Sequence, residues 1–170
     1  MSGSPVAVHL RDATPADLGV VAGLIRALAE YEHLEDEVLW SEEELATTLF
    51  GPDAVPRVVL AEPDDAPGVV AGLAIWFPTY STFRGRPGIW LEDLFVRPEH
   101  RGKGVGRALL DHLFERAGDG RVEWAVLDWN APSLAFYQSL GAQPVDGWTV
   151  YRWLRQAENS QARSEPEPEQ

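Results

Sequence analysis

The chain has 170 residues, 45% of them apolar and 24% charged, which suits one globular domain with a sizeable core. Its formal net charge of −13 argues against nucleic acids and anionic membranes as partners, because both attract cationic surfaces. The sequence has no cysteine, which excludes disulfides, a cysteine nucleophile and thiolate metal sites. The four histidines lack a metal-ligand spacing, so we expect no metal centre.

The chain also lacks targeting patterns. Residues 1–12 have neither the basic nor the apolar region of a secretory signal. No run approaches the roughly 18 consecutive apolar residues of a membrane span. We therefore expect a cytoplasmic protein.

The first part of the chain predicts a strand followed by two helices. A strand at 6–11 precedes a helix over 15–32, for which Thr14 is a suitable N-cap. A capping-box pattern at 41–44 opens a second helix, which ends at Gly51. Apolar residues recur along the first helix at three- and four-residue steps, which predicts a buried face made of Leu18, Val21, Leu24, Ile25 and Leu28.

The rest of the chain alternates strands and helices, which is an α/β order. Runs of β-branched and aromatic residues predict strands at 57–62, 68–77, 88–96, 121–129 and 148–154. Apolar periodicity predicts helices at 105–117 and 131–140. We expect one domain over 1–154, followed by a disordered tail at 155–170, where the sequence is polar and carries a Glu-Pro run.

A glycine-rich basic turn, "RGKGVG" at 101–106, connects a predicted strand to a predicted helix. It is not the phosphate loop of nucleotide hydrolases, because Lys103 is followed by Gly104 rather than Ser or Thr. It is not a dinucleotide fingerprint, because Arg107 stands where a third glycine is needed. Two interpretations remain: main-chain N–H groups that bind an anion at a helix N-terminus, or a tight turn with solvated basic residues.

The order of elements and this turn resemble the GNAT superfamily of N-acetyltransferases, whose acetyl-CoA signature is Arg or Gln, two residues, Gly, one residue, then Gly or Ala. The resemblance covers about residues 6–154 and is closer to the diamine branch, which acetylates spermidine, spermine or thialysine. The stretches that carry it are "ALAEYE", "LEDLFV", "RGKGVG" and "WNAPSLAFYQSLGA". The resemblance implies an α/β fold with a central mixed, mostly antiparallel sheet and helices on both faces.

The resemblance also implies acetyl-CoA as a co-substrate. In this family the main-chain amides of the turn bind the CoA pyrophosphate, and the strand before it pairs with the pantetheine arm. The cofactor-binding positions implied here are Leu94, Phe95, Val96, Arg101, Gly102, Lys103, Gly104, Val105, Gly106, Asn130, Ser133 and Tyr137. Asn130 also suits the N-cap of the helix at 131–140, and both roles stay open.

An acceptor amine must lose a proton before it attacks. Alkylammonium ions have a pKa near 10.4, so only about one molecule in a thousand is a free amine at neutral pH. We expect Glu92 to act as the base through water, although a paired or edge-exposed carboxylate is the alternative. Strand alternation predicts that its side chain shares the face of Trp90 and Leu94, opposite Asp93. The resemblance implies that Tyr137 protonates the departing thiolate, whereas its spacing alone indicates packing.

The substrate-binding residues expected from the resemblance are Tyr31 and Glu32 with Glu92 and Asp93. Tyr31 and Glu32 end the first helix within an acidic run, where carboxylates are unfavourable. A cationic substrate explains that position, and so does a solvated helix end. Arginines in the loop at 79–88 suit the carboxylate of an amino acid such as a lysine analogue, so polyamine and amino acid both remain candidates.

We therefore expect an N-acetyltransferase that moves the acetyl group of acetyl-CoA directly to a primary amine of a small cation in a ternary complex, without a metal. A protein or peptide amine acetyltransferase and a non-catalytic acyl-CoA-binding module are the alternatives. The seven tryptophans are ascribed mostly to packing and none to catalysis. The resemblance implies a homodimer, for which 148–154 is the candidate contact.

Overall fold

The computed structural model describes residues 6–154, so the tail predicted at 155–170 lies outside the described residues. The chain forms two compact units, Met1–Ala125 and Val126–Gln170. A single domain over 1–154 stays a prediction. Across residues 6–154, every helix is too short or too polar to cross a membrane.

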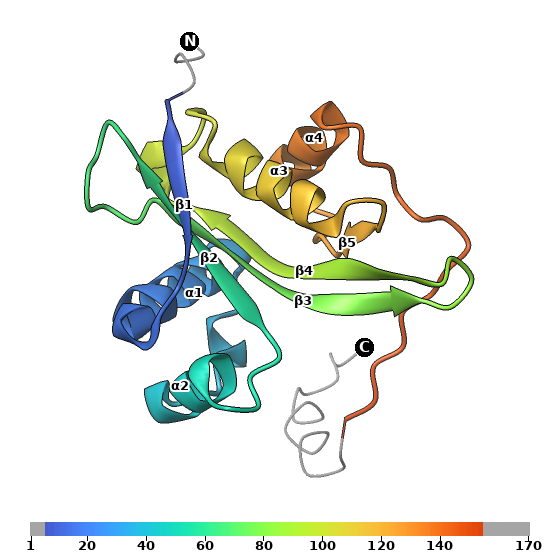
Figure 1. Cartoon of the computed structure of the whole chain (residues 1–170), viewed down its shortest axis with the longest axis horizontal. Helices are drawn as coiled ribbons and strands as arrows, with labels where there is room; N and C mark the ends of the chain where they lie inside the picture. Colours follow the sequence, from blue (N-terminus) through green and yellow to red (C-terminus); the bar gives the residue numbers. More distant parts are fainter. Residues whose placement is uncertain (1–5, 155–170) are drawn as a thin grey trace, which may run out of the picture. The chain divides into compact units, whose positions relative to one another are not determined.

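A five-stranded sheet forms the centre of the first unit (Figure 1). Its strands are β1 (Val8–Asp12), β2 (Arg57–Pro63), β3 (Gly72–Ser81), β4 (Arg86–Val96) and β5 (Val122–Trp124). They lie in the order β1-β2-β3-β4-β5, with antiparallel pairing from β1 to β4 and parallel pairing between β4 and β5. The predicted mixed, mostly antiparallel sheet is confirmed.

Helices cover both faces of this sheet, as expected. They are α1 (Leu18–Glu32), α2 (Glu42–Phe50) and α3 (Val105–Ala117), accompanied by the 3-10 turns η1 (Pro15–Asp17), η2 (Glu35–Glu37) and η3 (Pro98–His100). Figure 1 shows α1 and α2 on one side of the sheet and α3 on the other. The second unit contains α4 (Ala131–Ser139), close to its predicted bounds.

Local chemistry sets the ends of these helices. The Ser41 hydroxyl accepts a hydrogen bond from the Glu44 N–H at 3.2 Å, and the Glu44 carboxylate accepts one from the Ser41 N–H at 2.8 Å, which starts α2. α1 ends at His33, whose φ of 59° lies in the left-handed region. The helix therefore stops directly after Glu32, which places Tyr31 and Glu32 in its last turn.

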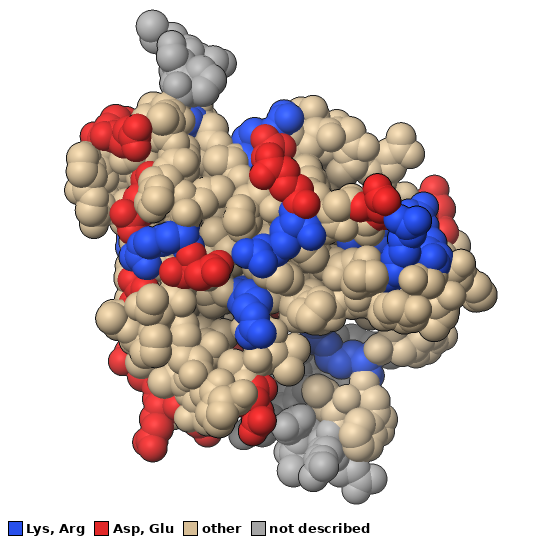
Figure 2. All heavy atoms as spheres, viewed as in Figure 1, with Lys and Arg blue, Asp and Glu red and all other residues tan. Residues whose placement is uncertain are grey.

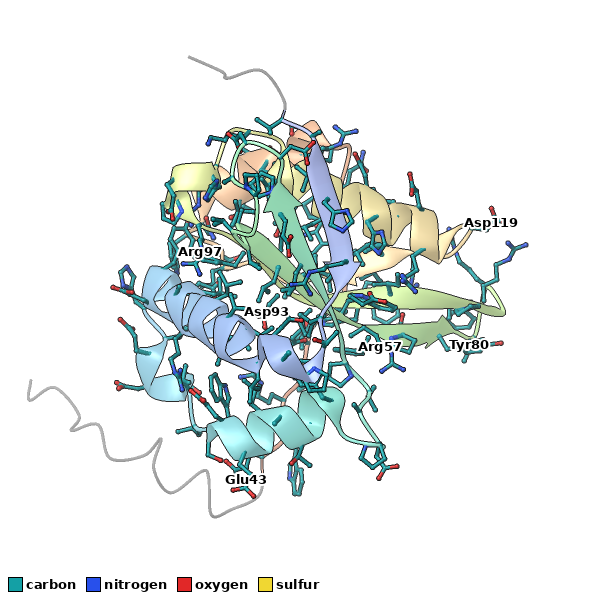
Figure 3. All side chains as sticks on the ribbon, turned by 60° about the vertical axis from the view of Figure 1, so that its left-hand side comes forward. Glu43, Arg57, Tyr80, Asp93, Arg97 and Asp119 are labelled. Atoms are coloured by element: carbon teal, nitrogen blue, oxygen red, sulfur yellow. The ribbon has the colours of Figure 1, made fainter. Side chains whose placement is uncertain are left out.

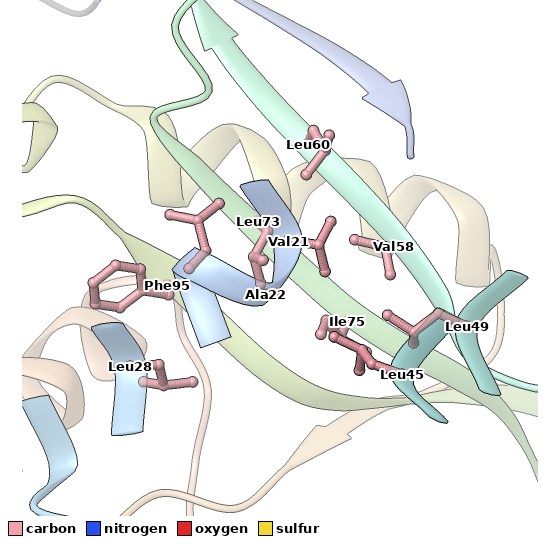
Figure 4. Packing of buried hydrophobic residues seen from close by; sticks show 11 residues of the cluster. Val21, Ala22, Leu28, Leu45, Leu49, Val58, Leu60, Leu73, Ile75 and Phe95 are labelled. Carbon is pink, nitrogen blue, oxygen red and sulfur yellow. The ribbon is translucent and has the colours of Figure 1, made fainter. Parts of the chain in front are cut away.

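The main core lies between the sheet and helices α1 and α2 (Figure 4). Strands β2 and β3 contribute alternate residues to it, because successive side chains of a strand point to opposite faces. Its buried members are Val21, Ala22, Leu24, Leu28, Leu45, Leu49, Val58, Leu60, Leu73, Ile75 and Phe95. On the other face, α3 buries Leu109, Leu110 and Leu113, and the Arg116 guanidinium lies 5.2 Å from the ring centroid of Trp76.

The pairing of β3 with β4 changes register near its middle. Ile75 is opposite Asp93, whereas the next residue, Trp76, is opposite Leu91. Glu92 is therefore an extra residue without a partner on β3. Because directly opposed residues share a face, Asp93 takes the face of Ile75, toward α1 and α2, and Leu91 takes the face of Trp76, toward α3.

The strand predicted at 68–77 lies four residues later, as β3, and two other predicted strands are largely missing. The strand expected over 121–129 forms only as β5, whose ladder with β4 ends at Trp124. The strand expected over 148–154 is wrong, because these residues have no regular secondary structure. A strand needs a neighbour that satisfies its main-chain N–H and C=O groups, and no described strand pairs with this segment.

Leu73 on β3 provides a test of the core. Its side chain is fully buried, so Leu73→Ala leaves a cavity, and we expect the free energy of unfolding to fall by about 3 kcal/mol. Leu39→Ala is the matched control, because Leu39 is 78% exposed, and it should change this free energy by less than about 0.5 kcal/mol. Urea unfolding followed by circular dichroism measures both variants. Equal effects at the two positions would contradict this location of the core.

Candidate active site

The second half of β4 has an edge that β5 does not cover. The ladder between the two strands pairs Ile89 with Val122 and ends where Leu91 pairs with Trp124. Within the first unit, residues 93–96 pair only with β3, and Glu92 pairs with no strand. The other edge of this segment therefore presents main-chain groups to a side that no strand of the described first unit occupies.

Hydrogen bonds identify these main-chain groups. The Arg97 N–H donates to the Ala71 carbonyl at 2.8 Å, on the β3 side. Because main-chain groups alternate in direction along a strand, the N–H and C=O of Leu94 and the N–H of Val96 point away from β3. The Val96 carbonyl points the same way and accepts a hydrogen bond from Arg101 Nε at 2.9 Å. This edge can pair with an extended, amide-containing ligand as it would with an added strand.

The glycine-rich turn places further N–H groups at the start of α3. Gly102 and Gly104 have φ values of 75° and 91°, in the region that favours glycine. Gly104 is the N-cap of α3, and no side chain caps this end. The N–H groups of 105–107 have no acceptor within the helix, and the helix dipole favours an anion there. Together with Lys103, whose ammonium lies 3.1 Å from Asp65, the turn suits a phosphate or pyrophosphate.

An arginine connects this turn to the end of α1. The Arg101 guanidinium lies 4.7 Å from the ring centroid of Tyr31 and 5.6 Å from that of Phe95. The Phe95 side chain belongs to the buried core, so it gives the guanidinium a fixed surface. Tyr31 and its neighbour Glu32 therefore lie beside the candidate anion-binding turn.

Asp93 of β4 lies near two other carboxyl groups, its neighbour Glu92 and Glu32 at the end of α1. Burial, followed by the negative charges of Glu92 and Glu32, raises the pKa of Asp93 to about 6. Burial also raises the pKa of Glu32. Figure 3 shows Asp93 close to α1. Residues 6–154 contain no group of three His, Cys, Asp or Glu side chains arranged to hold a metal ion.

The predicted faces of β4 are partly wrong. Regular alternation predicts that Glu92 lies with Trp90 and Leu94, opposite Asp93. The register shift overturns this, because Trp90 and Asp93 pair with β3 residues that share one face, whereas Leu94 pairs with a residue of the other face. Glu92 does stay with Trp90, whose indole Nε1 donates a hydrogen bond to Glu92 Oε2 at 2.8 Å.

Trp90 is thus a residue that the sequence analysis missed. The pattern ascribed the tryptophans mostly to packing, and a tryptophan two residues before a carboxylate on a strand is a weak signal. Of the arginines expected near the substrate, Arg86 instead pairs with Asp119 at 2.6 Å. Figure 3 shows Asp119 and Tyr80 well away from Asp93.

Asn130, Ser133 and Tyr137 belong to the second unit. Asn130 is 3% exposed, and its Oδ1 accepts a hydrogen bond from the Ser133 N–H at 3.3 Å, which confirms its role as the N-cap of α4. Tyr137 is half-buried on α4, with its ring centroid 5.4 Å from that of Phe136. The roles predicted for these three residues toward acetyl-CoA stay predictions.

Comparison with known proteins identifies the family. The model of the acetyltransferase (GNAT) family matches residues 21–142, which include most of α1, the carboxyl cluster, the glycine-rich turn and α4. The chain belongs to the GNAT family of acetyltransferases. Figure 2 shows blue and red side chains intermixed on one face of this GNAT protein, in keeping with its many exposed ion pairs.

The relatives of this GNAT protein include amine acetyltransferases. The thialysine N-epsilon-acetyltransferase of Bos taurus is 39% identical over 161 residues, which cover 88% of this chain and 94% of the relative. The L-ornithine N5-acetyltransferase of Arabidopsis thaliana is 32% identical over 85% of this chain and 83% of its own length. An aminoglycoside acetyltransferase from a soil metagenome, solved with sisomicin, has a TM-score of 0.67 at 15% identity, covering 86% of this chain and 95% of its own, which shows a shared fold alone.

The raised pKa of Asp93 predicts a pH-dependent stability of the GNAT fold. The folded-state value of about 6 exceeds the ordinary 3.8, so charging this carboxyl opposes folding increasingly as the pH rises from about 4 through 6. Asp93→Asn removes that cost. We expect the free energy of unfolding without ligand to rise by on the order of 1–3 kcal/mol near pH 7.5, and this gain to vanish below about pH 4.

Asp36→Asn is the matched control, because it removes the same charge from an exposed position on η2. It should change the free energy of unfolding by less than about 0.5 kcal/mol at either pH. Urea unfolding near pH 4 and pH 7.5 measures both variants. A gain for Asp93→Asn that is the same at both pH values would contradict the raised pKa.

Proposed function

We propose that this chain is an acetyl-CoA-dependent N-acetyltransferase for the terminal primary amine of a small cationic amino acid, of the class of thialysine, lysine or ornithine. The observation that carries this proposal is the carboxyl cluster of Glu32, Glu92 and Asp93 next to the uncovered edge of β4. The names of the bovine and plant relatives favour an amino acid over a polyamine.

Residues of the first unit fit acetyl-CoA, which supplies the activated acetyl group when it is bound. The N–H groups at the start of α3, with the positive charges of Arg101 and Lys103 nearby, suit the pyrophosphate. The outward N–H and C=O of Leu94 and the outward N–H of Val96 suit the amides of the pantetheine arm. In the second unit, Asn130 and Ser133 are proposed to contribute further contacts to this arm.

The carboxyl cluster serves the amine in two ways. Its negative charges bind the ammonium form of the substrate, and the substrate's positive charge offsets the repulsion among the carboxylates. Glu92 is exposed, so it can accept the ammonium proton through a water molecule, which leaves the neutral amine free to attack the acetyl carbonyl. Asp93 and Glu32 hold the cation from the side of α1, with Tyr31 beside them.

Tyr137 is the proposed acid. A phenolic hydroxyl is both a donor and an acceptor, so it can protonate the thiolate that leaves when the amide bond forms. The transfer is direct, from acetyl-CoA to the amine in a ternary complex. The sequence contains no cysteine that could carry the acetyl group as a thioester.

A thiol-release assay tests this function. We expect acetyl-CoA-dependent release of thiol with thialysine, lysine or ornithine, and slower release with spermidine, putrescine and a basic peptide. Tyr137→Phe removes only the hydroxyl and should lower kcat by about 100-fold, within the usual range for loss of a general acid. Tyr80→Phe is the matched control, because Tyr80 lies away from Asp93, and its kcat should stay at the level of the unsubstituted enzyme (Figure 3).

The other possible results of this assay would each contradict one part of the proposed function. Preferred turnover of spermidine would replace the amino acid by a polyamine, and preferred turnover of the peptide would indicate a macromolecular substrate. Binding of acetyl-CoA without thiol release from any amine would indicate a non-catalytic acyl-CoA-binding module. Full activity of Tyr137→Phe would remove this residue from the mechanism.

We also propose that the enzyme is a homodimer in which the C-terminal segment 148–154 contacts the second copy. This segment exposes Trp148, Val150, Tyr151 and Trp153, each by 77% or more. So much exposed apolar surface in one short segment is typical of an interaction site. A second copy also supplies the neighbour that this segment needs in order to form a strand.

Sedimentation velocity tests the dimer. We expect the unsubstituted enzyme to sediment as a dimer, and Trp148→Ser with Trp153→Ser to weaken association by at least about 100-fold, as for the loss of central aromatic residues of an interface. Phe83→Ser is the control, because Phe83 is 97% exposed in the connection between β3 and β4, outside this segment. A monomer for the unsubstituted enzyme, or a dimer for the double variant, would contradict the proposal.

A further inference from the structure

We propose that Trp90 is a positioning residue for Glu92: its indole N–H holds one carboxylate oxygen and thereby presents the other oxygen to the proton that leaves the amine. This inference rests on the proposed function, because it concerns the carboxylate to which that function gives the role of base. Neither the family match nor the relatives assign a role to this tryptophan.

The contact is short and has a defined direction. Trp90 Nε1 lies 2.8 Å from Glu92 Oε2. An indole nitrogen can only donate, and a carboxylate can only accept, so the polarity of this hydrogen bond is fixed. Because the acceptor is charged, the bond is among the stronger side-chain hydrogen bonds.

The donor stands on a rigid part of the sheet. Trp90 is opposite Phe77 of β3 on one side and Glu123 of β5 on the other, so β4 is held by two strands at this residue. Its side chain is half-buried. Catalytic groups are held best when their supports sit on such elements rather than on loops.

The acceptor, by contrast, has little else to hold it. Glu92 is the extra residue of the register shift, so it has no directly opposite neighbour on β3. Its side chain is exposed, and a glutamate in solvent loses substantial rotamer freedom when it is fixed in one geometry. The indole N–H selects one arrangement in advance, with Oε2 engaged and Oε1 left for the proton transfer.

Packing alone does not require this hydrogen bond. Trp76 lies opposite Leu91 on the neighbouring strand β3, packs against Arg116, and has a buried Nε1 with no partner among the described residues. A tryptophan of this sheet can therefore fill space without using its N–H. Phenylalanine keeps a six-membered aromatic ring at this position and removes the N–H donor together with the rest of the indole.

The test compares Trp90→Phe with Trp40→Phe in the complete chain, using lysine or thialysine and acetyl-CoA. Trp40→Phe is the matched control, because Trp40 packs against the core and stacks on Arg26. We expect Trp90→Phe to lower kcat by about tenfold, with the KM for the amine changed by less than about twofold. We expect no further loss when Trp90→Phe is added to Glu92→Gln, because the two residues act as one unit.

The outcomes separate this inference from the proposed function. Unchanged kcat in Glu92→Gln would overturn the proposed base itself. Low kcat in Glu92→Gln with unchanged kcat in Trp90→Phe would overturn only the positioning role. If Trp90→Phe raises the KM for the amine and leaves kcat unchanged, Trp90 acts on substrate binding instead. If Trp90→Phe lowers kcat as much in the Glu92→Gln variant as in the unsubstituted enzyme, Trp90 acts independently of Glu92, on the substrate or on the fold.

A second measurement needs no substitution of Trp90. In the 15N–1H spectrum of the complete protein, the indole signal of Trp90 should move in Glu92→Gln, because its acceptor changes from a carboxylate to an amide. The indole signals of the other tryptophans should keep their positions. An unmoved Trp90 signal would overturn the inference even if Trp90→Phe failed to fold.

Discussion

The pairing of β3 with β4 is the constraint on which the candidate site depends. Its register shift turns Leu91 toward α3 and Asp93 toward α1, and leaves Glu92 between them without a partner on β3. The apolar residues packed on the two faces of the sheet hold this register in place. A shift of the β3–β4 pairing by one residue would move the carboxyl of Asp93 to the apolar face under α3. Packing on both faces of the sheet therefore fixes the position of the chemistry at its edge.

The site is built at an electrostatic cost to the empty protein. Burial, followed by the negative charges of Glu92 and Glu32, raises the pKa of Asp93. Natural proteins retain such unfavourable arrangements where function requires them. A bound cation reverses the sign of this effect, since each carboxylate then gains an attractive partner. In the proposed function, affinity for the amine and lower stability without it thus have the same physical origin.

The sequence predicted the parts of this structure that depend on local pattern. Helix α1, the turn at 101–106 and the cap at Asn130 follow from periodicity, glycine spacing and capping chemistry, and the structure has all of them. The faces of β4 were not predictable, because a register shift depends on how two separate strands align. The segment 148–154 has a strand-like pattern but no described neighbour, and a single sequence does not reveal whether a partner strand exists.

The edge of β4 that no strand of the described first unit covers also bears on aggregation. A strand edge with free N–H and C=O groups is a template to which other chains can add, and natural proteins limit such growth with charged side chains and β-bulges. The segment 92–96 has both, in the carboxylates of Glu92 and Asp93 and in the register shift at Glu92. If the pantetheine arm occupies this edge, acetyl-CoA shields it as well as reacting beside it.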